Sequence, residues 1–181
     1  CAGLLCITTL TACSNQRKIT DDDLVKASYV AADSLLDEAR QHVKENLKMA
    51  QLDPYKTILV ASFVNIDDVQ TSSTFGRIVA EQIGSRVSQQ GYKVIEMKLR
   101  GNVFVQEQTG ELLLSREILE ISLNHDAHAV IVGTYAESKE FVYVTAKLIR
   151  ASDAVILASH DYSLPVGPNT KGLLKSKRRR N

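Results

Sequence analysis

The sequence predicts an α/β (α+β) fold, in which a mixed sheet of about five strands carries helices packed on it. Three observations predict it. Apolar residues recur at three- and four-residue steps in several segments, as on one face of an amphipathic helix. A near-continuous apolar run of strand length, residues 57–64, indicates a buried central strand. The last third of the chain holds three strand-like segments separated by short turns.

Residues 23–52 are predicted to form a long N-terminal helix. Thr20 and the three aspartates that follow it place capping and acidic residues before an apolar stripe. The stripe consists of Ala32, Leu35, Leu36, Ala39, Val43 and Leu47. The helix should end before Pro54, because a residue that precedes proline avoids the helical region. We expect this helix either to form an extra layer on the sheet or to act as a spacer toward a membrane.

The middle of the chain alternates between strands and helices. After the strand at 57–64 we expect a polar loop and then a helix over about 74–90, which Gly91 ends. Residues 92–99 are predicted to form a strand, and 103–105 are compatible with a short edge strand. Ser115 is placed to cap a third helix that ends near Asn124.

The strands of the last third are expected at 129–135, 141–149 and 154–162. In the middle one, apolar positions alternate with Tyr143, Thr145 and Lys147, which indicates one buried and one wet face. The predicted order is therefore β-α-β-α-β-β-β after the long helix, with residues 55–165 as one domain. Residues 166–181 are rich in Gly, Pro and basic residues, and we expect a basic disordered tail.

The charge of the chain is unevenly distributed. The formal net charge is +1, which gives no attraction of the whole molecule to nucleic acid. Six positive residues without an acid among them lie near the end of the sequence: Lys171, Lys175, Lys177, Arg178, Arg179 and Arg180. Without them the formal charge is −5, so the predicted domain is mildly acidic. The tail could contact anionic lipid, cell wall or an acidic partner; a solvated segment is the simpler interpretation.

The first residues indicate the compartment. Residues 1–12 are apolar and uncharged, too short for a bilayer span of ~20 residues, and similar to a truncated signal peptide. Leu10-Thr11-Ala12-Cys13 resembles a bacterial lipobox, in which the cysteine receives acyl chains, palmitate among them, and becomes the first residue of the mature protein. We therefore predict lipidation at Cys13 and a tether over 13–22. Ser14 favours sorting to the outer membrane. The alternative is a buried strand with incidental cysteines.

Few side chains indicate chemistry. His125 and His128 flank Asp126, but a zinc site needs about three or four ligands, and His42 and His160 are remote in sequence. We expect a surface turn there and no metal. A polar group between the first strand and the next helix is expected to cap that helix, with a ligand or partner contact as the alternative: Asp67, Asp68, Thr71, Ser72 and Ser73. No catalytic or phosphate-binding motif is found, so we predict a protein that is not an enzyme and needs no cofactor.

Several segments together resemble the FlgO-type flagellar outer-membrane lipoproteins. The similar segments are residues 72–83, 90–99, 110–117 and 126–135, together with the strands over 142–162. The resemblance covers about residues 55–165. It implies a lipid-anchored outer-membrane protein that faces the periplasm and is required for flagellar motility. It also implies a structural or assembly role at the outer-membrane end of the basal body, with basal-body proteins as partners; a homo-oligomer is left open. It supplies no catalytic residues.

Other periplasmic lipoproteins are similar in the order of their elements. They include activators of penicillin-binding proteins, so a regulator of cell-wall synthesis is the alternative function. The short tether from Cys13 to Thr20 disfavours a distant partner of that kind. They also include the curli export pore subunit, but residues 101–114 are too short for two spanning strands of ~9–11 residues.

Overall fold

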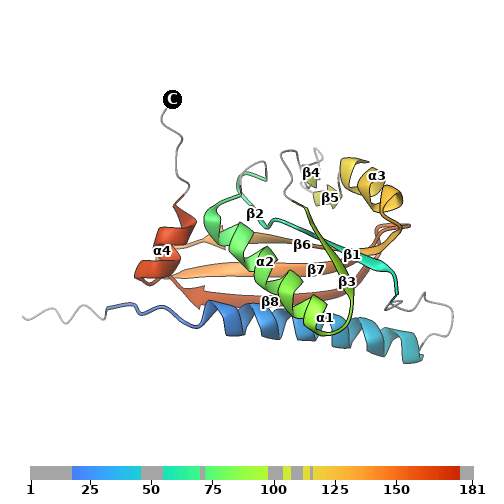
Figure 1. Cartoon of the computed structure of the whole chain (residues 1–181). Coiled ribbons are helices and arrows are strands. Elements are labelled where there is room, and N and C mark those ends of the chain that lie inside the picture. The colour runs from blue at the N-terminus through green and yellow to red at the C-terminus, as the bar shows by residue number, and fades with distance from the viewer. Residues whose placement is uncertain are drawn as a thin grey trace, which may run out of the picture.

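The computed structural model describes residues 18–45, 55–69, 72–97, 104–106, 112–114 and 116–175. A six-stranded mixed sheet is its centre, and its strands are β1 (Thr57–Ala61), β2 (Val64–Asn65), β3 (Lys93–Met97), β6 (Ala127–Glu137), β7 (Phe141–Arg150) and β8 (Ile156–Pro165). The helices are α1 (Leu24–Glu45), α2 (Thr74–Gln89), α3 (Arg116–Asn124) and α4 (Pro168–Leu174). The predicted fold class is confirmed, including the long helix that precedes the sheet (Figure 1).

The sheet has a parallel half and an antiparallel half. Its strand order is β3-β1-β6-β7-β8, with β1 parallel to both β3 and β6. The apolar strand β1 therefore lies inside the sheet, as its continuous burial requires. Strands β6, β7 and β8 form an antiparallel meander, in which Ile131 pairs with Leu148 and Ala146 pairs with His160. The two-residue strand β2 continues the pairing with β6 beyond the end of β1.

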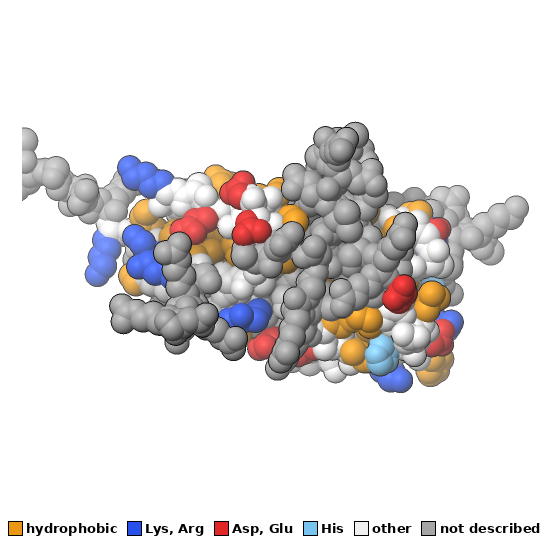
Figure 2. Space-filling model, turned by 90° about the horizontal axis from the view of Figure 1, so that it is seen from above, with side chains coloured by type: hydrophobic (Ala, Val, Ile, Leu, Met, Phe, Trp, Pro, Cys, Tyr) orange, Lys and Arg blue, Asp and Glu red, His pale blue; other side chains and the backbone are white. Residues whose placement is uncertain are grey.

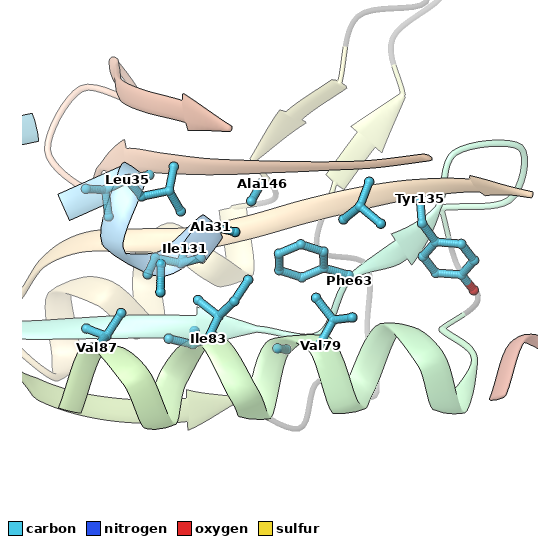
Figure 3. Close-up of a cluster of buried hydrophobic side chains, with 14 of the residues drawn as sticks. Ala31, Leu35, Phe63, Val79, Ile83, Val87, Ile131, Tyr135 and Ala146 are labelled. Carbon is cyan, nitrogen blue, oxygen red and sulfur yellow. The ribbon is translucent and has the colours of Figure 1, made fainter. Parts of the chain in front are cut away.

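Helices α1 and α2 cover one face of the sheet and form the main core with it. Leu35, Phe63, Val79, Ile83 and Ile131 point toward one another there (Figure 3). Their side chains are fully buried. The apolar stripe of α1 thus packs on the sheet, and of the two expected roles for this helix the extra layer is confirmed for residues 24–45. The predicted continuation of the helix to residue 52 lies outside the described residues.

Phe63 explains why the first strand stops before the predicted residue 64. Its backbone leaves the strand geometry after Ala61, and its ring turns into the main core. Two glycines make room for it. A Cβ on Gly133 of β6 would collide with the Phe63 ring, and a Cβ on Gly76 of α2 would collide with the Phe63 carbonyl oxygen. The apolar run of residues 57–64 therefore extends beyond β1 because Phe63 packs into the main core after the strand has ended.

The opposite face of the sheet is covered over its parallel half. Leu59, Val130, Val132 and Met97 form a second buried cluster there, against which Ile121 of α3 packs. A separate two-stranded sheet, β4 (Phe104–Gln106) paired with β5 (Leu112–Leu114), lies on the same side as α3 (Figure 1). The expected short strand near residues 103–105 is thus present, but it pairs with β5 and is not an edge strand of the main sheet.

The prediction of a disordered tail from residue 166 is wrong for residues 166–175. Residues 168–174 form α4, in which Thr170 and Leu174 are buried. Val166 is also buried and belongs to the main core. Pro168 occupies the start of the helix, where its fixed backbone angle is favourable. Residues 176–181 lie outside the described part of the chain.

Candidate functional site

The predicted lipidation site, Cys13, lies outside the described residues, but the segment that follows it is placed. Residues 18–23 run along the end of the sheet and lead into α1. Asp21 contacts Asn169 and Thr170 there, and Val166 contacts Glu140 of the turn 138–140. We call this end of the domain, made of residues 18–23, 138–140 and 166–175, the α4 junction (Figure 1).

Asp21 joins the first described segment to α4. Its carboxylate oxygens accept hydrogen bonds from the backbone N–H groups of Thr170 at 2.8 Å and Asn169 at 2.9 Å. These amides belong to the first turn of α4, where N–H groups have no partner within the helix. The Thr170 bond is the main reason that the pKa of Asp21 lies below its usual range. A carboxylate from a position 149 residues earlier in the chain therefore caps α4.

The segment that contains Asp21 lies very close to the start of α4. A Cβ on Gly167 would collide with the backbone nitrogen of Asp21, so this contact requires glycine. On the other side, the Val166 N–H donates to the carbonyl oxygen of Glu140 at 2.7 Å. The α4 junction therefore fixes the position of α4 against the rest of the domain.

Sequence reasoning missed the role of Asp21, which was interpreted only as an acid ahead of α1. A signal for it is present. Gly167-Pro168 has the form of a helix start, yet Gly167 offers no side chain to cap it. A helix start of this kind needs an acceptor from elsewhere in the chain.

Charged side chains crowd the α4 junction. Figure 2 shows Lys and Arg side chains gathered at the end of the molecule where Figure 1 places α4. Lys171 and Lys175 are exposed on or next to α4, while Asp22, Asp23 and Glu140 are exposed nearby in the junction. The described part of the junction is thus mixed in charge, and the positive excess belongs to the sequence that follows it, residues 177–180.

The polar loop after β1 acts as a helix cap, as predicted. Ser73 is the N-cap of α2, and its side-chain oxygen accepts from the Gly76 N–H at 3.3 Å. Ser72 donates to the carbonyl oxygen of Phe63 at 2.7 Å. The Ser73 N–H is bound in turn by the Tyr135 hydroxyl at 3.1 Å. The backbone N–H of Asp67 donates to the Asn65 side chain at 2.9 Å. Thr71 lies outside the described residues.

Of the two histidines around Asp126, His125 lies at the expected surface turn, whereas His128 belongs to strand β6 and is half-buried. His125 and Asp126 connect α3 to β6, and Asp126 has a positive φ of 46°. Its carboxylate pairs with Lys56 at 3.2 Å. His128 lines a cavity of about 210 Å³ with Ser122 and Ser152. His160 lies on β8 beside Tyr162, so the structure does not bring it to this turn. Within the described residues, no group of three or more His, Cys, Asp or Glu side chains could hold a metal ion.

The antiparallel half of the sheet offers a second candidate surface. On the face away from α1 and α2, Phe141 and Tyr143 of β7 are 40% and 54% exposed, and their ring centroids lie 6.4 Å apart. Tyr143 pairs with Ser163 and Thr145 with Asp161 across to β8. This is the wet face that the alternation in β7 predicted. We call it the open sheet face.

None of the helices in the described part of the chain is long and apolar enough to cross a bilayer. A comparison with curated proteins gave no match.

Solved structures with a similar arrangement of elements come from several bacteria. The LpoB C-terminal domain from Salmonella enterica has a TM-score of 0.45 at 9% identity, over 72% of this chain and 95% of that one. The PelC dodecamer from Paraburkholderia phytofirmans has a TM-score of 0.44 at 16% identity, over 63% and 74%. Lipoprotein GNA1162 from Neisseria meningitidis has a TM-score of 0.42 at 19% identity, over 64% of this chain and 85% of that one. At such identities and TM-scores the likeness carries no functional argument.

The match to a family model is of a different kind, because it rests on the sequence itself. The model described as FlgO protein matches residues 29–169. That range begins inside α1, takes in the whole main sheet and ends in α4. It includes all four of the similar segments identified in the sequence. The chain belongs to the FlgO family.

Proposed function

We propose that this protein is a lipoprotein of the outer membrane, anchored by acyl chains on Cys13 and facing the periplasm. It serves as a structural or assembly component at the outer-membrane end of the flagellar basal body, and motility requires it. The observation that carries the proposal is membership of the FlgO family. The apolar residues 1–12, which end in the lipobox-like sequence Leu10-Thr11-Ala12-Cys13, support the anchor.

The anchor is strong on simple physical grounds. Each CH₂ group buried in the bilayer contributes about 0.8 kcal/mol, and one acyl chain alone binds only marginally. A fully processed lipoprotein cysteine carries several chains, so the attachment is stable. The membrane is then the fixed point of the molecule, and the α/β domain presents its surfaces from there.

The tether keeps the domain close to the membrane. Lys18, the first described residue, is five positions after Cys13, and an extended chain covers at most about 18 Å over that length. Because residues 18–23 belong to the α4 junction, this end of the domain faces the bilayer. The strands of the sheet lead from the junction toward the far end of the molecule (Figure 1).

The protein acts by contact and not by chemistry. The open sheet face offers the exposed aromatic pair Phe141 and Tyr143. Exposed aromatic side chains are enriched at the centres of protein interfaces. The partners in this proposal are basal-body proteins or further copies of this chain.

The test replaces Cys13 by serine in the chromosomal gene. Cys13→Ser should abolish incorporation of labelled palmitate, release the protein from the outer-membrane fraction and reduce swimming in soft agar. Cys6→Ser is the matched control, because Cys6 lies in the part of the leader that is discarded, and it should leave all three readouts unchanged. A Cys13→Ser protein that stays firmly membrane-bound in cells that swim normally would contradict the proposal.

A second measurement separates the flagellar role from regulation of cell-wall synthesis. Basal bodies purified from wild-type cells should contain the protein, and imaging of basal bodies from a deletion strain should show lost density at the outer-membrane end. Recovery of a penicillin-binding protein with the tagged chain, from cells whose basal bodies are intact without it, would favour the cell-wall regulator instead.

A further inference from the structure

A cavity of about 210 Å³ lies at the end of the domain opposite the α4 junction. Strand β7 leads from the junction to the turn 151–155, and α3 ends near this turn (Figure 1). Figure 2 shows hydrophobic side chains beside a histidine at this end of the molecule. The walls of the cavity come from α3, β6 and the turn, and they include Ser122, Leu123, Ala127, His128, Ala151 and Ser152. Segments far apart in the sequence therefore build this pocket.

A β-bulge turns His128 toward the cavity. Thr57 of β1 pairs with Ala127 of β6. The next pair joins Ile58 to Ala129, so His128 is an extra residue in β6. In a regular strand neighbouring side chains point to opposite faces, which would separate His128 from Ala127. Both instead line the cavity, on the face of the sheet that α3 covers. Bulges that re-aim a side chain in this way are over-represented next to active sites.

The backbone is strained at two places around the cavity. Asp126, which lines it, has a φ of 46°, and Ala154 of the adjoining turn has a φ of 58°. Within the described residues, these are the only ones other than glycine with a positive φ. The left-handed region is unfavourable for alanine, because its Cβ crowds the following carbonyl oxygen. Strain of this kind persists where the surrounding structure holds it, and it clusters at active sites and ligand sites.

One polar atom of the cavity wall lacks a hydrogen bond. Nε2 of His128 is buried, and no described residue supplies a donor or an acceptor to it. Most buried polar atoms have a partner, because an unpaired one has lost its hydrogen bonds to water without replacement. A ligand in the cavity can supply the partner that the fold does not.

The size and charge of the cavity restrict that ligand. An engineered protein cavity of about 150 Å³ holds benzene, so a volume of about 210 Å³ takes one aromatic ring with a small substituent. Leu123, Ala127 and Ala151 supply apolar walls for the ring. Lys56 and Asp126 also line the cavity, and Nζ of Lys56 lies 3.2 Å from the Asp126 carboxylate. Because these two charges balance each other, the cavity favours a neutral ligand.

We propose that this cavity binds a phenolic group, an aromatic ring that carries one hydroxyl. The ring packs between the apolar walls, and the hydroxyl makes the missing hydrogen bond to Nε2 of His128. The imidazole turns about its Cβ–Cγ bond to present Nε2, and this torsion has broad preferences. A hydroxyl suits either tautomer of the imidazole, since it can both donate and accept a hydrogen bond. The source is a free phenol or a tyrosine side chain of another protein. The inference does not depend on the proposed anchor or on the flagellar role.

The experiment follows the histidine rings and the backbone amides by NMR during titration with 4-methylphenol. The protein is the predicted mature chain, residues 13–181 with Cys13→Ser, which retains every described residue. Toluene is titrated for comparison, because it has the same ring and methyl group without the hydroxyl. Both ligands should shift the Ala127 and Ala151 amides, and 4-methylphenol should also shift the ring nitrogens of His128.

Two histidine variants isolate the hydrogen bond. His128→Leu removes Nε2 and keeps an apolar side chain in the wall. The ratio of the affinity for 4-methylphenol to the affinity for toluene should fall about tenfold in this variant, since only the hydroxyl loses its partner. His160→Leu is the matched control, because His160 lies on β8 and does not line the cavity. It should change the ratio by less than about twofold.

A third variant keeps the proposal testable if His128→Leu does not fold. Ser152 is exposed at the cavity, so Ser152→Leu should fill the entrance without disturbing the core, and both ligands should be excluded. An unchanged affinity ratio in His128→Leu, or an equal fall in both histidine variants, would overturn the proposal. So would binding that Ser152→Leu leaves intact, or the absence of any shift up to the solubility limit of 4-methylphenol.

A last titration distinguishes the two sources of the phenolic group. N-acetyltyrosinamide carries the same ring and hydroxyl on a peptide backbone. Binding as tight as that of 4-methylphenol would assign the cavity to a tyrosine of another protein, whereas its exclusion would assign a free phenol. Either result supports the phenolic site, and neither bears on palmitate labelling at Cys13, which tests the anchor.

Discussion

Asp33 of α1 and Arg86 of α2 form a two-pronged ion pair that ties the two helices together on the outside of the domain. Nε of Arg86 lies 2.9 Å from Oδ1 of Asp33, and Nη2 lies 2.9 Å from Oδ2. The Gln90 side-chain amide donates a further hydrogen bond to the same carboxylate at 2.9 Å. The Arg86 guanidinium also lies over the ring of Tyr29, 5.6 Å from its centroid. Both partners of the pair remain partly exposed.

This pair should make stability depend on acid pH. The hydrogen bonds from Arg86 are the main cause that holds the pKa of Asp33 below its usual range. A lowered folded-state pKa contributes stability above the unfolded value of about 4, and this contribution is lost as pH falls through the folded value. Asp33→Asn should therefore lower the urea midpoint at pH 7, and its difference from wild type should shrink at pH 3. Asp37→Asn, which breaks a more exposed pair with Arg40 in the same helix, should have the smaller effect at pH 7.

The packing of Phe63 against Gly133 predicts a large effect of one methyl group. Gly133→Ala places a Cβ in collision with the Phe63 ring on a central strand that cannot move aside, which should cost about 2 kcal/mol or more in the free energy of unfolding. Gly172→Ala is the control of opposite sign. A Cβ there meets nothing within 4 Å in α4, so the change should stabilise by about 0.5 kcal/mol. Equilibrium unfolding in urea measures the free energy of unfolding of both variants. If Gly133→Ala were not destabilised, Phe63 would not be packed against Gly133 as described.

The membership of α1 in the core can be tested with two apolar residues of that helix. Leu35→Ala should destabilise the domain by about 2–5 kcal/mol, because Leu35 is fully buried. Val30→Ala should change stability by less than about 0.5 kcal/mol, because Val30 is 49% exposed. Thermal unfolding should remain a single transition in both. A separate early transition of α1, with the sheet unaffected, would mean that the helix is a spacer after all.

The capping of α4 by Asp21 predicts a local change in hydrogen exchange. Asp21→Ala removes the acceptors of the Asn169 and Thr170 amides, which should then exchange severalfold faster. Asp22→Ala, one residue further on, should leave both amides as protected as in wild type. Because the pKa of Asp21 is lowered by its hydrogen bond from Thr170, protection in the wild-type chain should persist to a lower pH than the usual aspartate pKa of about 4 would allow. Amide exchange followed by NMR gives the rates at each position.

The open sheet face predicts a change in function without a change in stability. Tyr143→Thr keeps a residue suited to a strand and removes an exposed ring, so unfolding should shift by less than about 1 kcal/mol. Swimming in soft agar should nevertheless be reduced, if this face contacts basal-body partners. Val25→Thr, at a 46% exposed position of α1, serves as the control and should swim normally. Normal swimming of the Tyr143 variant would assign the contacts to another surface.

The sequence was most informative where one local period extends over many residues. The stripe that contains Leu35 and Leu36 predicted α1, and the alternation around Val144 and Tyr143 predicted both faces of β7. Such patterns depend only on the spacing of neighbours along the chain, so they can be recognised without a structure.

The errors lie where distant parts of the chain decide the local conformation. Helix α4 has no long apolar period, and it depends on a carboxylate from Asp21. Phe63 looks like part of a strand, but it turns inward because Gly133 and Gly76 leave space for it. The pairing of β4 with β5 and not with the main sheet likewise could not be read from the apolar residues alone. Cys13, the single predicted site residue, stays a prediction.

Contacts between the first and the last described elements affect how the protein folds. Glu38 accepts from the Ser159 amide across 121 positions of sequence, and Asp21 reaches Thr170 across 149. Contacts at such separations form slowly, because a long loop must close before they give any stability. The core therefore cannot be completed until β8 and α4 are available to pack against α1 and the segment before it. If the polypeptide crosses a membrane with its first residues leading, most of its length has crossed before the complete fold can form.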